Sequence, residues 1–172
     1  MSRTDKVGIF VYGTLKQNQL RGSLWPRPPI AIGPAITLGE LWDLGSYPGM
    51  HPGSDWVLGE LWIFRPEDIK ETFRVLDEIE EYDPKEDCGL YLRRQIDVRG
   101  LEDQDRLGPL QKAFAYVMPE SSPRHPRQPM RRIEPWKEVR WRVEGIAIDK
   151  LVACWPDPDS LVPEDFEDEI GF

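Results

Sequence analysis

One acidic residue of a predicted helix lies on the same face as the apolar residues of that helix. A proline followed by two acids predicts a helix start at residues 65–68, and the helix is expected to run to about residue 81. With Ile69 set at zero, Phe73 falls at about 40°, Leu76 at about −20° and Glu80 at about 20° around the helix. A carboxylate there is costly unless it is paired, hydrogen-bonded or directed into a polar pocket. Glu80 is therefore a candidate functional group.

Two structural explanations of Glu80 stay open on the sequence alone. The helix could end before Glu80, or Glu80 could pair with an arginine such as Arg93 or Arg94, because structural ion pairs also place acids on apolar faces. The other acids of the helix fall on its opposite face or on its flanks, and Asp77 is expected on a flank or outside the apolar face.

A second candidate is the turn Tyr12-Gly13-Thr14-Leu15, which follows a predicted strand at Val7–Tyr12. A strand that ends in glycine at a tight turn can present consecutive backbone N–H groups, and such groups bind a carboxylate or stabilise an oxyanion. The spacing of the following lysine does not match a phosphate-binding loop. An ordinary turn is the alternative.

Other kinds of site are excluded by residue types. His51 and His125 are the only histidines, so a two-histidine metal site and a Ser-His-Asp triad are improbable, and we expect no metal or cofactor. The two cysteines cannot form a disulfide framework. A net charge of −9 argues against nucleic acid as a general partner, and a solvated loop is preferred over RNA binding for the basic residues 119–142. No apolar run predicts a membrane span or signal peptide, so we expect a cytoplasmic protein.

The elements that would position these residues are mostly strands. Beyond the first strand and the helix, the sequence predicts strands at Ala35–Trp42, Trp56–Phe64, Leu90–Val98, Lys112–Met118 and Val139–Asp149. This order favours an α+β fold, with a small barrel as one form of it. We expect one domain over residues 1–150, in which residues 119–138 form a Pro-rich basic loop or insertion. An acidic tail follows at 151–172, with seven acids and no Lys or Arg from residue 155 onward.

Six segments in order resemble the γ-glutamylcyclotransferase-like superfamily, in its AIG2-like and γ-glutamylamine cyclotransferase branch. They cover roughly residues 7–118 and comprise Val11–Lys16, Gly39–Gly49, Val57–Trp62, Leu76–Tyr82, Tyr91–Arg94 and Ala113–Val117. The resemblance implies a small mixed β-barrel with flanking helices. It also implies that Glu80, the glutamate of the Leu-Asp-x-x-Glu pattern, is the catalytic acid and base.

The same resemblance implies a substrate and its binding residues. The turn from Tyr12 through Gly13 and Thr14 to Leu15 would form the substrate-binding loop, and the remaining substrate-binding candidates are Tyr47 and Tyr116. The substrate would be a small γ-glutamyl compound that is cyclised to 5-oxoproline with release of an amine, without a cofactor, by a monomer or a homodimer. The alternative is a non-catalytic binding or scaffold protein on the same fold, which uses the basic loop and the acidic tail. The residues from 119 onward have no counterpart in the resemblance.

Overall fold

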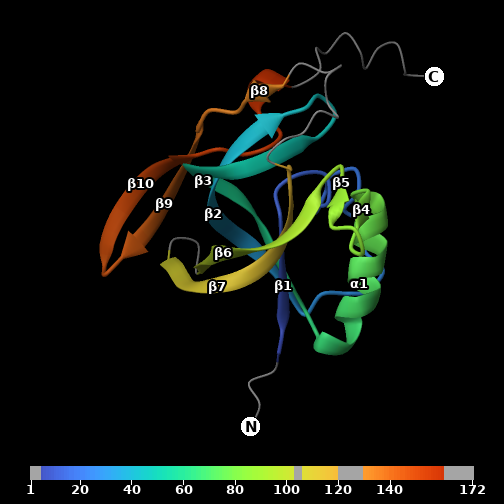
Figure 1. Cartoon of the computed structure of the whole chain (residues 1–172). Helices are drawn as coiled ribbons and strands as arrows, with labels where there is room; N and C mark the ends of the chain where they lie inside the picture. Colours follow the sequence, from blue (N-terminus) through green and yellow to red (C-terminus); the bar gives the residue numbers. More distant parts are fainter. Residues whose placement is uncertain (1–4, 103–105, 120–129, 161–172) are drawn as a thin grey trace, which may run out of the picture.

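The computed structural model describes residues 5–102, 106–119 and 130–160 of the 172 in the chain (Figure 1). Ten strands, one α-helix and one 3-10 turn lie in these ranges. They are β1 (Val7–Val11), β2 (Ala31–Asp43), β3 (Pro48–Phe64), α1 (Pro66–Ile79), β4 (Tyr82–Asp83), β5 (Cys88–Gly89), β6 (Leu92–Glu102), β7 (Arg106–Val117), β8 (Arg131–Arg132), β9 (Lys137–Val143), β10 (Ile146–Val152) and η1 (Pro158–Ser160).

Most of the strands join one strongly curved mixed sheet in the order β1-β3-β2-β6-β7-β9-β10, and β8 pairs with β2. Strand β7 also returns to β1 through one parallel register pair, Ile9 with Phe114. We therefore describe a curved sheet in which β1, at one end of the strand order, also meets β7 at a single register position, rather than a closed barrel. The expectation of several flanking helices is wrong for the described residues, which contain α1 alone.

The predicted strands are present, but several of their boundaries differ, among them the start of β7 at Arg106 instead of Lys112. Strands β2 and β3 begin at Ala31 and Pro48, well before the apolar runs that predicted them, and pair along most of their length. The expected last strand, Val139–Asp149, is instead a hairpin of β9 and β10. Its turn lies at Glu144 and Gly145, both with positive φ, as two-residue hairpin turns require.

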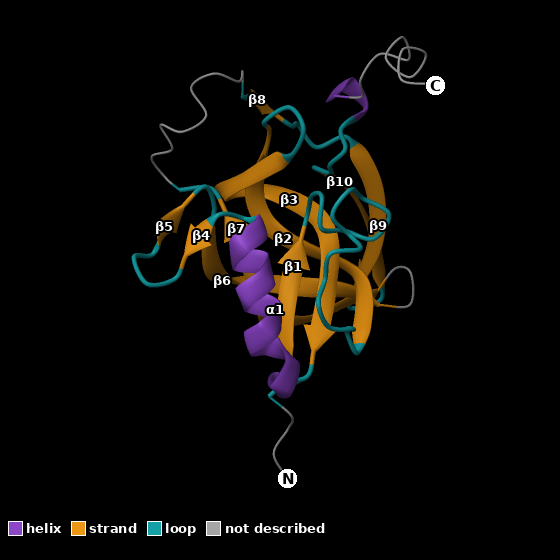
Figure 2. Ribbon diagram, turned by 90° about the vertical axis from the view of Figure 1, so that its right-hand side faces the viewer, coloured by secondary structure: helices purple, strands orange, loops and turns teal. Residues whose placement is uncertain are grey.

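Helix α1 packs against the outer side of the sheet near β1 and β7 (Figure 2). It begins at Pro66, with Glu67 and Asp68 in its first turn, where the helix dipole favours acids. Its apolar residues join one core cluster with β1, β3 and β7. The helix ends at Ile79, two residues earlier than expected, and Glu81 turns the chain away with φ of 53°.

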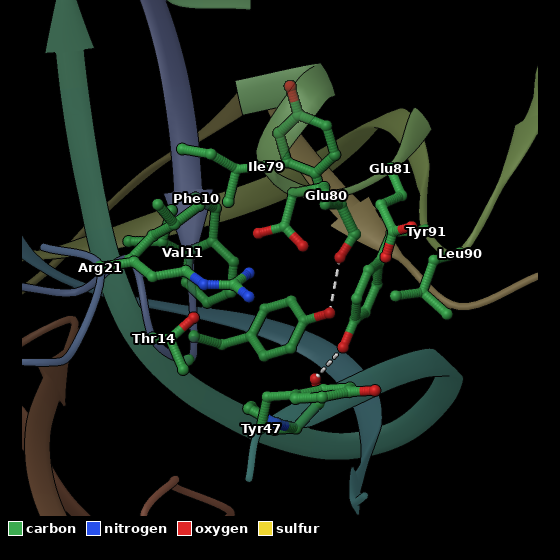
Figure 3. Close-up of a pocket in the computed structure, with 15 residues that line it drawn as sticks. Phe10, Val11, Thr14, Arg21, Tyr47, Ile79, Glu80, Glu81, Leu90 and Tyr91 are labelled. Carbon is green, nitrogen blue, oxygen red and sulfur yellow. Dashed lines mark hydrogen bonds between the residues drawn. The ribbon is translucent and has the colours of Figure 1, made fainter. Parts of the chain in front are cut away.

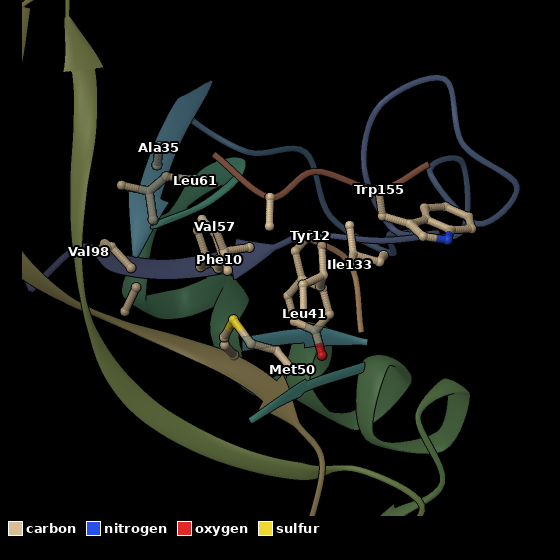
Figure 4. Packing of buried hydrophobic residues seen from close by; sticks show 13 residues of the cluster. Phe10, Tyr12, Ala35, Leu41, Met50, Val57, Leu61, Val98, Ile133 and Trp155 are labelled. Carbon is tan, nitrogen blue, oxygen red and sulfur yellow. The ribbon is translucent and has the colours of Figure 1, made fainter. Parts of the chain in front are cut away.

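Residues 153–157, which follow β10, pack into the fold. Ala153 pairs with Val57, and Trp155 is buried at one end of the cluster that fills the curved sheet, beside the loop after β1 (Figure 4). The Lys16 ammonium donates a hydrogen bond to the Trp155 carbonyl at 2.5 Å. The expected boundary between residues 150 and 151 falls inside β10. Residues 120–129 of the predicted basic loop and 161–172 of the predicted acidic tail lie outside the described residues.

Candidate active site

A cavity of about 110 Å³ lies where the end of β1, the end of α1, the turn before β3 and the start of β6 meet (Figure 3). All seven residues singled out from the sequence line this one cavity: Tyr12, Gly13, Thr14, Leu15, Tyr47, Glu80 and Tyr116. Segments far apart in sequence therefore converge on one place, as a functional site requires.

Glu80 is the C-cap residue of α1, directly after Ile79, and its side chain is directed into the cavity (Figure 3). Its N–H still donates to the Leu76 carbonyl at 2.8 Å, so the helical geometry extends to this residue although the helix proper stops at Ile79. The side chain is only 8% exposed. Burial raises the pKa of Glu80 from 4.5 to about 7, against an opposing effect of the Arg21 charge.

The pairing of Glu80 with Arg93 or Arg94 is wrong. Arg93 forms an ion pair with Asp77 at 2.7 Å, and Arg94 pairs with Asp87 at 2.7 Å. Within the ranges that the structure describes, the Glu80 carboxyl makes no hydrogen bond and no ion pair. A buried carboxyl without a protein partner is poised to exchange a proton with a ligand.

The turn after β1 is held by its carbonyl groups, which leaves its amides open. The Gly13 carbonyl accepts from Lys16 N at 3.1 Å, and the Thr14 carbonyl accepts from Arg21 N at 2.8 Å. The Leu15 carbonyl accepts from the Trp25 indole at 3.0 Å. The N–H groups of Gly13, Thr14 and Leu15 find no acceptor among the described residues, although all three residues are buried. Buried backbone donors are almost always paired, so these three indicate a ligand site.

The close packing of the turn explains its glycine. A Cβ on Gly13 would lie 2.7 Å from Cγ of Pro48. This is closer than real Cβ atoms come to other heavy atoms, so a larger residue would require a shift of the turn or of Pro48. Pro48 in turn follows Tyr47, so the two loops that line the cavity are in direct contact.

Three tyrosine hydroxyls near the cavity are fixed by hydrogen bonds. Tyr12 donates to the Tyr116 carbonyl at 2.5 Å, and Tyr91 donates to the Pro48 carbonyl at 2.6 Å (Figure 3). Tyr116 donates to Asp77 Oδ1 at 2.7 Å. Burial raises the pKa of all three, so these side chains are neutral walls of the site at ordinary pH. Tyr47 stands edge-on to Tyr91, with 6.3 Å between ring centroids.

Asp77 corrects the expectation from the helical pattern. It was placed on a flank or outside the apolar face, but it is 7% exposed and bridges Tyr116 and Arg93. The Arg93 guanidinium also covers the Phe73 ring at 4.1 Å. The helical wheel places Asp77 beside the apolar face of the helix. Asp77 can be buried there because Arg93 of β6 pairs with its carboxylate.

Arg21 and Tyr91 are among the cavity residues that the sequence did not single out. Arg21 lies in a turn-rich loop without periodicity, and only its distance of six residues from Leu15 links it to the site. Tyr91 was noticed in a Tyr-x-Arg pattern but was not assigned to the site.

The described part of the chain shows no group of three or more His, Cys, Asp or Glu side chains arranged to hold a metal ion. None of its helices has the length and apolar character needed to cross a membrane.

Solved structures of other proteins are similar to this chain. A crystal structure of an AIG2-like protein from Mus musculus is 25% identical, with a TM-score of 0.51, over 72% of this chain and 84% of that one. A solution structure from Arabidopsis thaliana is 18% identical with a TM-score of 0.49 and covers 69% and 72% of the two chains. A structure titled gamma-glutamyl cyclotransferase is 17% identical with a TM-score of 0.46 and covers 67% and 68%. No curated protein matches the chain.

The family model described as "Gamma-glutamyl cyclotransferase, AIG2-like" matches residues 9–138. This range includes every residue of the cavity described above and ends at the second residue of β9, so it leaves out most of the β9–β10 hairpin. The chain belongs to the AIG2-like gamma-glutamyl cyclotransferase family.

Proposed function

We propose that this protein is a γ-glutamyl cyclotransferase, which converts a γ-glutamyl amine or γ-glutamyl-amino acid into 5-oxoproline and a free amine. One observation carries the proposal: a buried, unpaired carboxyl and three unpaired backbone N–H groups line the same cavity. The carboxyl can accept and donate a proton, and the backbone N–H groups can stabilise a negative charge.

The reaction is an internal attack. The α-amino nitrogen of the γ-glutamyl group forms a bond to its own γ-carbonyl carbon, and the bond from that carbon to the leaving nitrogen breaks. Glu80 takes the proton that the attacking nitrogen loses and gives it to the leaving nitrogen, so one carboxyl serves both steps. No other reactant is consumed. Because the attack is intramolecular, a cavity that holds the substrate folded supplies much of the acceleration.

The raised pKa of Glu80 suits both halves of this cycle. A carboxylate with its ordinary value of 4.5 would be a weak base, whereas a value of about 7 brings it closer to the nitrogen it must deprotonate. The N–H groups of Gly13, Thr14 and Leu15 are assigned to the oxygen of the γ-carbonyl, which becomes negative when the nitrogen attacks.

Incubation with γ-glutamyl-amino acids, γ-glutamyl-lysine and glutathione, followed by an assay for 5-oxoproline, tests the proposal. Glu80→Gln is nearly isosteric and should lower kcat by about 10²- to 10⁴-fold. Glu78→Gln is the matched control, because Glu78 is exposed on the same helix and should have no effect on kcat.

The outcomes separate the enzyme from the scaffold alternative. Full activity of Glu80→Gln would remove the role assigned to Glu80. Absence of 5-oxoproline from every substrate, with the wild-type protein folded, would favour a binding protein on the same fold.

A further inference from the structure

Arg21 is the only lysine or arginine among the residues that line the cavity. Its N–H donates to the Thr14 carbonyl at 2.8 Å, which ties its backbone to the turn. Its side chain extends into the cavity, and the guanidinium points toward the Glu80 carboxyl (Figure 3). The turn therefore fixes the backbone of Arg21, and the side chain of Arg21 is directed toward the Glu80 carboxyl.

The guanidinium has no protein acceptor in the part of the chain that the structure resolves in detail. Neither Glu80 nor Glu81, the two acids of the cavity lining, forms an ion pair with it. Its charge does reach Glu80, because Arg21 is the charge that opposes the rise in the pKa of that carboxyl. Five N–H donors in a fixed planar fork match a carboxylate well, and here they face a cavity of about 110 Å³.

We propose that Arg21 binds the α-carboxylate of the substrate and so selects amides whose attacking amine stands next to a carboxylate. This rests on the cyclotransferase function proposed above and assigns a specificity residue to the same site. The chemistry of the substrate gives the reason. The α-carboxylate and the α-amino group share one carbon atom, so a carboxylate held by Arg21 brings the amine beside Glu80.

This assignment divides the polar groups of the cavity between the two ends of the substrate. Arg21 takes the permanent negative charge, and the turn amides stay free for the charge that develops on the γ-carbonyl oxygen. The turn amides would bind a charge that appears only in the transition state, and such contacts raise kcat. Arg21 would bind a carboxylate that is charged before and during the reaction, so it acts mainly on substrate binding.

The test compares two amides of the same amine. One is the γ-glutamyl amide, and the other is the 4-aminobutanoyl amide, which lacks only the α-carboxylate and cyclises to pyrrolidin-2-one. The wild-type protein should prefer the first in kcat/KM. Arg21→Gln should reduce that preference by about 10- to 100-fold, the usual size of a charge-assisted contact, mainly through KM. Arg21→Lys should restore part of it, because the charge remains but the fork is lost.

Arg27→Gln is the matched control, since Arg27 is an exposed arginine of the same loop outside the cavity. Thermal unfolding shows whether each variant is folded, and binding of 5-oxoproline and pyrrolidin-2-one, measured by calorimetry, gives a second readout. Selective loss of 5-oxoproline affinity in folded Arg21→Gln supports the proposal even where turnover is too slow to follow.

Two results overturn it in different ways. If wild type makes 5-oxoproline but Arg21→Gln keeps the same preference, or weakens both amides equally, Arg21 does not read the α-carboxylate and the cyclotransferase function stands. If wild type neither turns over any γ-glutamyl amide nor binds 5-oxoproline, both the function and the role of Arg21 fall.

Discussion

Replacement of Glu80 by glutamine should change how the stability of the protein depends on pH. Burial raises the pKa of Glu80 from 4.5 to about 7 in the folded protein. Between these values the folded protein retains a proton that the unfolded chain has released, so the free energy of unfolding falls as the pH rises. The stabilising effect is complete below pH 4.5 and is lost by about pH 7. At about 1.36 kcal/mol per pH unit, this interval corresponds to about 3 kcal/mol.

Glutamine does not titrate, so the variant lacks this loss. The free energy of unfolding of Glu80→Gln, minus that of wild type, should rise by about 3 kcal/mol between about pH 4 and about pH 8.5. Urea unfolding followed by tryptophan fluorescence at several pH values measures the difference. Neighbouring Tyr12, Tyr47 and Tyr91 have raised pKa values and stay neutral over this range, so they add nothing to the effect.

Glu78→Gln removes the same charge from an exposed position of the same helix and should leave the pH profile of stability unchanged. A constant difference between Glu80→Gln and wild type at all pH values would refute the reasoning, because it would mean that Glu80 titrates alike in the folded and unfolded states. A wild type that gains stability over the variant with rising pH would refute it more strongly. That result requires a paired carboxylate with a lowered pKa.

Three more substitutions test the turn that lines the cavity, a buried ion pair and the packing of the core. Gly13→Ala places a Cβ 2.7 Å from Cγ of Pro48 and should lower kcat/KM by about tenfold or more, measured by 5-oxoproline release. Asp77→Ala leaves Arg93 without its partner in a largely buried ion pair and should cost about 3 kcal/mol in urea unfolding. Trp155→Ala empties a site that is 8% exposed and should cost about 3–5 kcal/mol in the same assay.

Each of these has an internal control. Gly33→Ala adds a methyl group where nothing lies within 4 Å, so activity should persist. Glu71→Ala breaks an exposed pair with Arg74 and should be much milder than Asp77→Ala. Leu151→Ala truncates a residue that is 51% exposed and should lower the free energy of unfolding only slightly. If Trp155→Ala lowers it no more than Leu151→Ala does, Trp155 is not a buried part of the core.

What was predictable from the sequence depended on regular local patterns. Glu80 was singled out because its place on an apolar helical face is a local property, and the structure directs it into a cavity. The same rule misplaced Asp77, since its burial depends on Arg93 from a distant strand. Arg21 belongs to an irregular loop, and its backbone is held by a hydrogen bond to the Thr14 carbonyl. No sequence pattern predicts this hydrogen bond.

The fold shows the same division. The strand pairs of the curved sheet follow β-branched and aromatic runs, but the prolines in the first part of β2 and β3 concealed how early these strands begin. The sequence predicts a single strand in place of the β9–β10 hairpin, because glutamate, here Glu144, is an unusual residue for a turn position with positive φ. Trp155 is buried together with residues of the first strand and is bonded to the loop that follows it. These partners are distant in sequence, so the local sequence around Trp155, which is acidic, does not predict its burial.

The bond between Lys16 and the Trp155 carbonyl joins residues 139 positions apart. On a ribosome that adds about 5–20 residues per second, the turn that lines the cavity emerges on the order of ten seconds before this partner does. Strand β1 likewise pairs with Phe114 of β7, so a strand that is synthesised early is completed by residues that are synthesised about 100 positions later. Limited proteolysis of ribosome-bound chains of increasing length should show the turn protected only after residue 155 has emerged. A chain that stops before Tyr116 therefore carries the Tyr12–Leu15 motif without the complete cavity.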